Sequence, residues 1–289
     1  MPPITQAPSG PRIVCYHQTH FHDDEYVSVL PLITEETGVT HVIVAAIHLN
    51  DGPGNITLNN DPPNSPRFEQ LWDEVLVLQD VGVKVLGMLG GAAKGSFARL
   101  DQSDAEFEAY YVPLRDMIRT HQLQGLDLDV EEKMSLRGIM RLIDRLKVDF
   151  GEDFIVTLAP VATALQRGKH ISGFDYEALE VMRGGKIAWY NTQFYCGWGT
   201  MALTMPYDLI VAAGWLPEKV VAGVSTSPEN ADGYVPLEIL TPVLRILRHR
   251  YPTFGGVMGW EYFRSLPGGV ERPWEWAGVM SKTLPPRAP

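Results

Sequence analysis

Seven residues near the middle of the chain, Gly125 to Glu131, alternate strictly between apolar and acidic side chains. The apolar positions are Leu126, Leu128 and Val130, and the acidic positions are Asp127, Asp129 and Glu131. A period of two is that of a β-strand, whose successive side chains point to opposite faces. The pattern therefore predicts a strand with one buried face and three acids on the other face, each about 6.6 Å from the next.

Three carboxylates on one face repel one another, so at least one of them holds its proton to a higher pH than a free carboxyl does. A carboxyl that stays protonated near neutral pH is what a general acid needs. Two other interpretations remain open. One is a solvated edge strand, against which the intervening apolar residues argue. The other is a site for Mg²⁺ or Ca²⁺, which prefer carboxylate oxygens. Glu132 follows at once and is expected to point away from the acids, with a role at the surface.

The whole chain sets limits on the kind of protein. It has 289 residues, 45% of them hydrophobic, and a formal net charge of -11. That charge argues against nucleic acid and against an anionic membrane as partners, because both attract positive proteins. It is compatible with a neutral substrate. No apolar run is long enough to cross a bilayer.

Localisation and thiol chemistry stay open. Met1 to Gly10 contains no apolar signal segment, so the chain is intracellular as written, or secreted if a signal has been removed. Asn55-Ile56-Thr57 is a glycosylation sequon, relevant only to an exported chain. Cys15 and Cys196 lie in apolar, strand-like surroundings, and we expect two buried free thiols, with a disulfide as the alternative.

Short apolar runs alternate with helical segments along the chain. The expected strands are 12–16, 41–47, 84–89, 125–131, 154–158, 186–195, 220–224 and 255–260. The clearest helices are expected at Ser135–Asp149, with Ser135 as cap, and at Leu237–Tyr251. Eight such repeats predict an α/β fold, a single (β/α)8 TIM barrel with no large inserted domain. An open doubly wound sheet is the rival, but no Gly-rich nucleotide loop opens an early helix.

One catalytic domain is expected over residues 1–289, with its core at about 11–284, a polar N-terminus and a disordered Pro-rich tail. The Pro-rich segment Asp51–Pro66 is expected to be a loop after the second strand. Active sites of such barrels lie where the strands end. Glu131, Tyr195 and Trp260 end the fourth, sixth and eighth expected strands, so they are expected to converge on one mouth.

The fourth strand, Gln124-Gly125-Leu126-Asp127-Leu128-Asp129-Val130-Glu131, resembles the Asp-Gly-x-Asp-x-Asp-x-Glu signature of glycoside hydrolase family 18. Gln124 replaces the first acid, away from the catalytic end. The third strand, 84–91, resembles a family motif that usually reads Ser-x-Gly-Gly, with Met88 in place of serine. Segments 189–195 and 255–260 resemble the sixth and eighth strands. The likeness covers nearly the whole chain and is closest to small fungal endo-β-N-acetylglucosaminidases, with the closer match in segments 158–165, 255–263, 265–269 and 273–277.

The resemblance implies a retaining glycosidase in which the substrate's own acetamide is the nucleophile. Glu131 is then the general acid and base, and Asp129 orients the acetamide N–H. Asp127 shares a proton with Asp129, and Tyr195 donates to the acetamide oxygen. No cofactor is implied. Possible partners are N-glycans or glycoproteins, or else chitin oligosaccharides, and we expect a monomer.

Eight further residues are expected to line the sugar pocket: Trp260 as the floor under a pyranose ring, Gln193, Asn191, Gly90, Gly91 and Met88, and more weakly Tyr16 and Gln18. Plainer interpretations are a core aromatic for Trp260, a tight turn for Gly90 and Gly91, and, for the catalytic candidate Tyr195, a buried aromatic with a satisfied hydroxyl. His17, His20 and His22 are expected to be polar loop residues and not metal ligands, because no fourth ligand is evident.

The predicted function is cleavage of the β-1,4 bond in the chitobiose core of N-linked glycans. A chitinase is the first alternative, because fold and acids do not separate the two activities. A catalytically inert sugar-binding barrel and an unrelated metal-dependent barrel hydrolase are further alternatives.

Overall fold

The computed structural model describes residues 10 to 285 of the chain. The predictions for the polar N-terminus, and for the tail beyond residue 285, lie outside the described residues.

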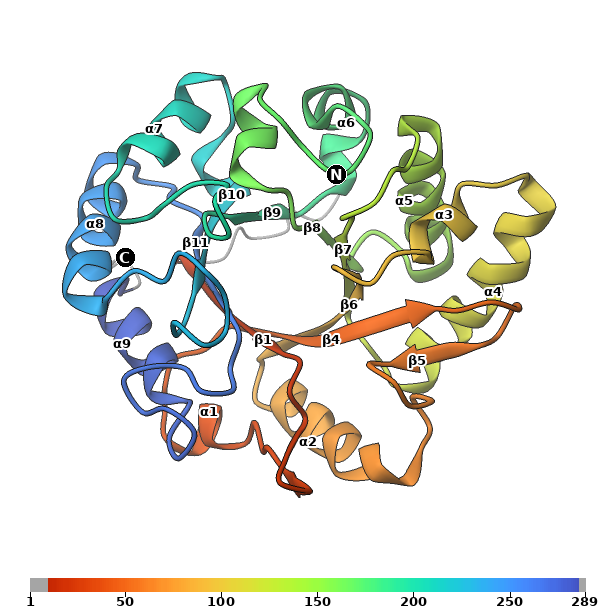
Figure 1. The fold of residues 1–289 in the computed structure, drawn as a ribbon, viewed down its shortest axis with the longest axis horizontal. Helices are drawn as coiled ribbons and strands as arrows, with labels where there is room; N and C mark the ends of the chain where they lie inside the picture. The colour runs from red at the N-terminus through yellow and green to blue at the C-terminus, as the bar shows by residue number, and fades with distance from the viewer. Residues whose placement is uncertain (1–9, 286–289) are drawn as a thin grey trace, which may run out of the picture.

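Eight parallel strands close into a barrel (Figure 1). They are β1 (Arg12–His17), β4 (His41–Leu49), β6 (Lys84–Gly90), β7 (Gly125–Asp129), β8 (Ile155–Leu158), β9 (Trp189–Gln193), β10 (Val220–Ser225) and β11 (Gly256–Trp260). The barrel closes because β1 pairs with β4 on one side and with β11 on the other. The predicted single (β/α)8 barrel is confirmed.

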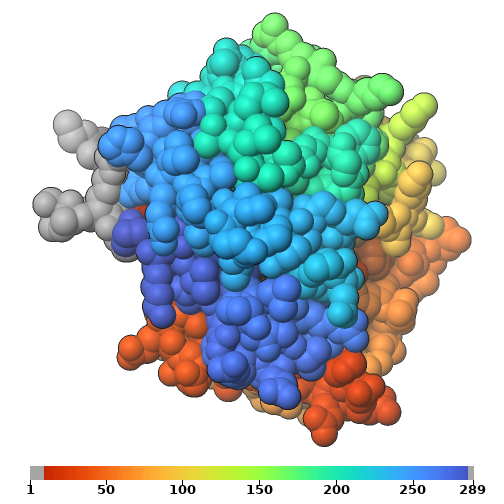
Figure 2. All heavy atoms as spheres, turned by 60° about the vertical axis from the view of Figure 1, so that its left-hand side comes forward, coloured from red at the N-terminus to blue at the C-terminus, as the bar shows by residue number. Residues whose placement is uncertain are grey.

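Helices surround the barrel. They are α1 (Pro31–Thr34), α2 (Glu69–Asp80), α3 (Ser96–Leu100), α4 (Asp104–Thr120), α5 (Leu136–Phe150), α6 (Tyr176–Arg183), α7 (Met205–Ala212), α8 (Leu237–Arg250) and α9 (Glu275–Thr283), with short 3-10 turns at Pro66–Phe68, Ala162–Gln166, Gly184–Lys186 and Pro217–Lys219. Figure 2 shows the flank on which the C-terminal third of the chain, in cyan and blue, forms a continuous surface.

The two helices predicted from the sequence are confirmed to within one residue. Ser135 caps α5 as expected, because its hydroxyl oxygen accepts a hydrogen bond from the Gly138 amide at 3.0 Å. α8 ends at Arg250, with three basic residues in its last turn that complement the negative end of the helix dipole.

Apolar side chains fill both sides of the barrel wall. Leu126 and Leu128 of β7 belong to the large cluster between strands and helices. The alternate positions of other strands, such as Val14, Leu86 and Met258, form a second cluster inside the barrel. The acids of β7 share this inner side, which fixes where the site lies.

Three local predictions need correction. β7 ends at Asp129 and β9 at Gln193, so Glu131 and Tyr195 lie two residues beyond their strands. At β7, the last bond to the neighbouring strand is the one from the Gly91 amide to the Asp129 carbonyl, at 2.9 Å. The Pro-rich segment is not only loop, because β5 (Ile56–Leu58) pairs antiparallel with β4. A second small hairpin joins β2 (Phe21–His22) to β3 (Glu25–Tyr26).

The cysteine prediction holds for one residue. Both thiols are free; Cys15 is buried, and burial raises its pKa to about 12. Cys196 is exposed, because it follows β9 in a loop at a φ of 53° and does not continue the strand. Across residues 10 to 285, no helix is both long and apolar enough to span a bilayer.

Candidate active site

The three acids of the fourth barrel strand form a line from the barrel interior to its mouth. Asp127 is fully buried, Asp129 is 6% exposed, and Glu131, just past the strand, is partly exposed. The predicted alternation is therefore observed for the two aspartates, and the chain carries Glu131 out to the rim. The solvated edge-strand interpretation is wrong, because β7 lies between β6 and β8.

Asp127 is held by three donors from three other strands. It accepts hydrogen bonds from the Tyr16 hydroxyl at 2.7 Å, the Thr157 hydroxyl at 2.5 Å and the Asn191 amide at 3.0 Å. Burial raises the pKa of Asp127, while the three hydrogen bonds act in the opposite direction. This acid is thus fixed in position by the barrel floor.

Gln193 links the two outer acids. Its side-chain nitrogen lies 3.2 Å from Asp129 Oδ1 and 3.5 Å from Glu131 Oε1. The same nitrogen donates to the Ala159 carbonyl at 3.0 Å, which fixes the amide orientation. Both carboxyl groups therefore face one point on β9, and their charges interact.

The surroundings favour proton retention by this pair. Burial holds the pKa of Asp129 well above its usual range, and the nearby charges of Glu131 and Asp127 raise it further. Burial also raises the pKa of Glu131, which the hydrogen bond from Gln193 partly offsets. Because the two acids titrate together, the first proton lost makes the second harder to remove. Such a pair can supply a general acid close to neutral pH.

Tyr195 and Trp260 lie at the same mouth. Tyr195 is 6% exposed, and within residues 10 to 285 its hydroxyl has no hydrogen-bond partner. Burial, followed by the charges of Asp129 and Glu131, holds its pKa well above the usual value, so it remains a donor. Trp260 is partly exposed and tilts against Tyr16 with ring centroids 5.5 Å apart. The unpartnered Tyr195 hydroxyl and the partly exposed Trp260 indole therefore lie next to the acids.

The glycine pair after β6 permits a close approach to β7. Gly90 and Gly91 have φ values of 95° and 90°, which favour glycine. A Cβ on Gly90 would lie 2.6 Å from the Asp129 carbonyl oxygen, and one on Gly91 would lie 3.6 Å from Asp129 Oδ2. Met88 is buried inside the barrel beneath this turn. These residues form the wall next to the central acid.

Comparison with known proteins places the chain in a family. A profile for glycosyl hydrolases family 18 matches residues 12–225. The chain belongs to glycosyl hydrolase family 18. This confirms the family predicted from the fourth-strand motif.

Two solved structures match this chain almost end to end. Chitinase ChiC from Aspergillus fumigatus is 58% identical with a TM-score of 0.88, over 94% of this chain and 99% of that one. A fungal endo-β-N-acetylglucosaminidase of glycosyl hydrolase family 18 is 51% identical with a TM-score of 0.92, over 96% and 99%. The fungal endoglycosidase likeness expected from the sequence is thus present, beside an equally extensive likeness to a fungal chitinase.

Among curated proteins, Chitinase 2 of Rhizopus oligosporus is 25% identical over 212 residues, which cover 66% of this chain and 36% of that protein. Chitinase D of Niallia circulans is 31% identical over 134 residues, which cover 40% of this chain and 25% of that protein. The matched region is thus about a third or less of the length of these relatives.

Two predicted sugar contacts of this family 18 barrel lie below the mouth. Tyr16 is 1% exposed and its hydroxyl is used by Asp127. Asn191 is fully buried, donates to Asp127 and accepts from the Trp189 indole N–H at 2.8 Å. Both side chains were predicted to contact the sugar, and in the structure both donate hydrogen bonds to Asp127. Gln18 lies above them in the loop after β1, with no side-chain partner among the described residues.

Four residues near the site were not predicted from the sequence. Thr157 and Trp189 support the floor, as described above. Glu261 is buried directly after Trp260, and it accepts hydrogen bonds from the Gln18 and Thr19 amides at 2.9 and 2.8 Å. Glu132 points away from the acids as expected, but it accepts from the Gly95 and Phe97 amides at 2.9 and 2.8 Å, and so holds the loop after β6. Thr157 and Trp189 had a signal, because each lies on an expected strand, and Trp189 is two residues before Asn191 and so shares its face.

The histidine prediction is partly wrong. His17 lies in β1 and is fully buried, and His20 is 2% exposed, so neither is a polar loop side chain. Burial lowers the pKa of His17 well below its usual value and that of His20 to about 4. His22 is partly exposed. Over the described part of the chain, no three His, Cys, Asp or Glu side chains are arranged to hold a metal ion.

Proposed function

We propose that this family 18 barrel is a retaining endo-β-N-acetylglucosaminidase that cleaves the β-1,4 bond in the chitobiose core of N-linked glycans. The observation that carries the proposal is the linked pair of Asp129 and Glu131 beside the unpartnered Tyr195 hydroxyl. Glu131 is open to the mouth, whereas Asp129 is nearly buried beneath it. One acid is thus placed to move protons and the other to hold a group that reaches into the pocket.

In the proposed reaction, Glu131 protonates the oxygen of the leaving sugar. The carbonyl oxygen of the 2-acetamido group bonds to C1 of the same sugar while the bond from C1 to the leaving oxygen breaks, and an oxazolinium ion forms. Glu131 then removes a proton from water, which attacks C1 from the face that the leaving group occupied. The bond from C1 to the acetamide oxygen breaks, so the acetamide is restored and the β configuration is retained. The substrate supplies the nucleophile, so no protein carboxylate is required to bond to C1.

The remaining groups are assigned from their positions. Asp129 accepts the acetamide N–H and balances the positive charge that develops on the ring. The Tyr195 hydroxyl donates to the acetamide oxygen and sets its angle of attack. Asp127 holds a proton in common with Asp129, and Trp260 supports the apolar face of the sugar. Gln193 keeps the two outer acids aligned.

A chitinase is the second candidate, favoured by the 58% identity to chitinase ChiC from Aspergillus fumigatus. The chemistry is the same, and the substrate is a linear N-acetylglucosamine chain. Substrates for either activity are neutral at the cleaved bond, which suits a chain with net charge -11.

Mass analysis of the products from a high-mannose glycopeptide and from chitin oligomers tests the proposal. A single N-acetylglucosamine left on asparagine, formed faster than chitin fragments, is expected. Efficient release of chitobiose from chitin oligomers with an intact glycopeptide would instead identify a chitinase. Binding of both sugars without any product would identify an inert sugar-binding barrel.

A further inference from the structure

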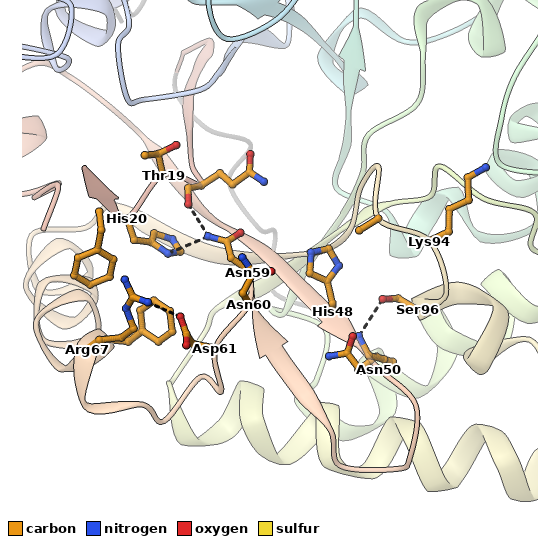
Figure 3. A pocket seen from close by; sticks show the side chains of 15 residues that line it. Thr19, His20, His48, Asn50, Asn59, Asn60, Asp61, Arg67, Lys94 and Ser96 are labelled. Carbon is orange, nitrogen blue, oxygen red and sulfur yellow. Dashed lines mark hydrogen bonds and ion pairs between the residues drawn. The ribbon is translucent and has the colours of Figure 1, made fainter. Parts of the chain in front are cut away.

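The acids are open at one end of the barrel and supported from the other. At the carboxyl ends of the strands, where substrates of such barrels bind, a polar pocket of about 610 Å³ lies beside them, with His48 between Thr19 and Lys94 (Figure 3). At the opposite end, Trp189 is the first residue of β9 and is 3% exposed. Trp189 does not line the pocket, so its effect on a reaction at the acids must pass through other side chains.

Alternate residues of β9 face the acids of β7 across the barrel interior. Asn191 donates to Asp127 at 3.0 Å, and Gln193 donates to Asp129 at 3.2 Å. Trp189 shares this face, because it lies two residues before Asn191. Its indole N–H donates to Asn191 Oδ1 at 2.8 Å. A line of hydrogen bonds therefore runs from the closed end of the barrel to the deepest acid.

The chemistry of these groups fixes the direction of each bond. An indole N–H can only donate, so the atom of Asn191 that it meets is the amide oxygen. The amide nitrogen then faces Asp127 Oδ1, and because that nitrogen also only donates, Oδ1 must accept. If the amide turned over, two donors would meet at Trp189 and two acceptors at Asp127. All three side chains are buried, so neither mismatch could be relieved by solvent.

The Trp189 ring is itself held in place by the first residues of two other strands. The guanidinium carbon of Arg12 lies 4.5 Å from the ring centroid, and the His41 ring meets it edge-on with centroids 4.8 Å apart. Arg12 also donates to two backbone carbonyls, at 2.9 and 3.3 Å. Burial lowers the pKa of Arg12 to about 10 and that of His41 to about 3, so one is charged and the other is neutral. These contacts fix the indole, and with it the direction of its N–H.

The orientation of the amide affects where the acids hold their proton. Asp127 Oδ1 accepts from the Thr157 hydroxyl at 2.5 Å as well as from Asn191, so two donors occupy this oxygen. Burial raises the pKa of Asp127, and the bonds from Thr157, Tyr16 and Asn191 oppose that rise because they stabilise the charged form. For Asp129, burial and the nearby acidic charges all raise the pKa. Asp127 is therefore expected to ionise before Asp129.

One acid and three tyrosines interact with the charge of Asp127. Burial holds the pKa of Tyr16, Tyr176 and Tyr195 above the usual value, so all three stay neutral. Asp129 is the acid whose pKa responds to the charge of Asp127. The proton balance of Asp127 is thus set by Asp129 and by the donors to its own carboxylate.

We propose that Trp189 is a positioning residue for the reaction. By fixing the amide of Asn191, it keeps Asp127 an acceptor at Oδ1. The proton that the acids share is then held by the outer pair, Asp129 and Glu131, from which it can pass to the leaving oxygen. The inference rests on the roles proposed for these acids, and it applies equally to an N-glycan and to chitin as substrate.

The first test replaces Trp189 by phenylalanine, which keeps an aromatic ring and removes the N–H. The variant and the unchanged protein are compared on a high-mannose glycopeptide or on a chitin oligomer, whichever the unchanged protein cleaves faster. We expect kcat to fall about 10-fold with KM within about twofold, because the amide is no longer held and fewer molecules carry the proton on the outer pair.

Trp72→Phe is the matched control. Trp72 lies on α2, outside the barrel, and donates its N–H to the Pro63 carbonyl at 2.7 Å. It also contacts a histidine, because its ring stacks on His121 with centroids 3.9 Å apart. Its replacement is expected to change kcat by no more than about twofold. An unchanged kcat in Trp189→Phe, or an equal loss in Trp72→Phe, overturns the proposal.

A second measurement does not depend on turnover. Carboxyl ¹³C resonances of the unchanged protein are expected to show that Asp127 loses its proton at a lower pH than Asp129. In Trp189→Phe the Asp127 midpoint is expected to rise by about one pH unit, because its charged form loses a fixed donor. An unmoved Asp127 midpoint in the folded variant contradicts the proposal. If Asp127 ionises after Asp129 in the unchanged protein, the proposal is wrong whether or not the variant folds.

A third test asks whether Trp189 acts through Asn191. Asn191→Leu removes the donor to Asp127 and is expected to lower kcat to a similar extent. The double variant is expected to lie within about twofold of Asn191→Leu alone. Losses that multiply to about 100-fold would show that Trp189 acts by another route and would reject the proposal. If the protein cleaves chitin and leaves the glycopeptide intact, the proposed function is wrong, whereas the role of Trp189 stands or falls by these three tests.

Discussion

Replacing Asp129 by asparagine tests the electrostatic coupling that the site depends on. In the unchanged protein, the last proton of the Asp129–Glu131 pair leaves against the charge of the first. Asparagine keeps the size of the side chain and removes that charge. Glu131 is then the only acid of the pair, and it loses its proton at a lower pH. The alkaline limb of kcat/KM, which reports this loss in the free enzyme, is expected to move to lower pH.

The size of the effect follows from the Gln193 bridge. One nitrogen lies 3.2 Å from Asp129 Oδ1 and 3.5 Å from Glu131 Oε1. The two oxygens are therefore no more than about 7 Å apart, where two charges repel by about 2 kcal/mol at an effective dielectric of about 20. Removing that repulsion weakens proton binding roughly thirty-fold. Solvent at the half-buried Glu131 screens the charges, so about tenfold is the smallest effect we expect.

The assay is the pH dependence of kcat/KM on an aryl chitobioside, for Asp129→Asn and the unchanged protein. Carboxyl ¹³C resonances of Glu131 give the same titration without activity. Glu271→Gln removes an exposed acid and serves as control, with an unshifted limb. An unshifted limb and resonance in Asp129→Asn would refute the coupling. The variant is also expected to use a preformed sugar oxazoline better than the natural glycan; equally poor use of both contradicts the acetamide-orienting role.

Four other outcomes are expected. Glu131→Gln lowers kcat/KM about 10²–10⁴-fold and leaves the Kd for a chito-oligosaccharide within about threefold, as turnover and calorimetry will show; normal turnover rules out its role as the acid. Tyr16→Phe removes one of three donors to the deepest acid, costs about 1–2 kcal/mol and lowers Tm by about 2–3 °C in scanning calorimetry, and an unchanged Tm contradicts this. Gly90→Ala costs about 1–3 kcal/mol more than Gly82→Ala, which shares the positive φ but has open space around it; equal urea midpoints for the two would show that the close approach is unimportant. Incubation with EDTA leaves the rate unchanged, and a loss restored by Mg²⁺ or Ca²⁺ would favour the metal-dependent alternative.

Much of the fold could be predicted from local pattern. The eight strands were placed within about three residues, because a run buried on both faces is apolar along its length. Strand ends were less predictable. The segment 186–195 was expected to be a strand along its whole length, yet the strand itself covers only Trp189–Gln193. The residue at which a strand ends depends on how far the neighbouring strands extend. That length cannot be predicted from the residues of the strand itself.

The candidate site also has features that could be predicted from the sequence and features that could not. The order of Asp127, Asp129 and Glu131 on one face was readable, because alternation along a strand is a local property. The different burial of the three acids could not be predicted from the sequence, and this difference is the basis of their proposed roles. The sequence also marked Tyr16 and Asn191 as sugar contacts, whereas the structure places both beneath the acids. Residue type shows that a side chain is polar, but its neighbours decide whether it meets solvent.

The sequence by itself determined that this chain forms a barrel of alternating strands and helices, with three acids at alternate positions in and directly after the fourth strand, since both follow from spacing along the chain. Only the tertiary structure decided which groups surround those acids. Tyr16 reaches Asp127 across 111 positions of sequence, and Gln193 reaches Asp129 across 64. The pocket around His48 likewise comes from segments that follow three neighbouring strands, β1, β4 and β6, and meet only when those strands pair. Side-chain periodicity reports which face is buried, whereas closure of the sheet sets which residues from other strands share that face.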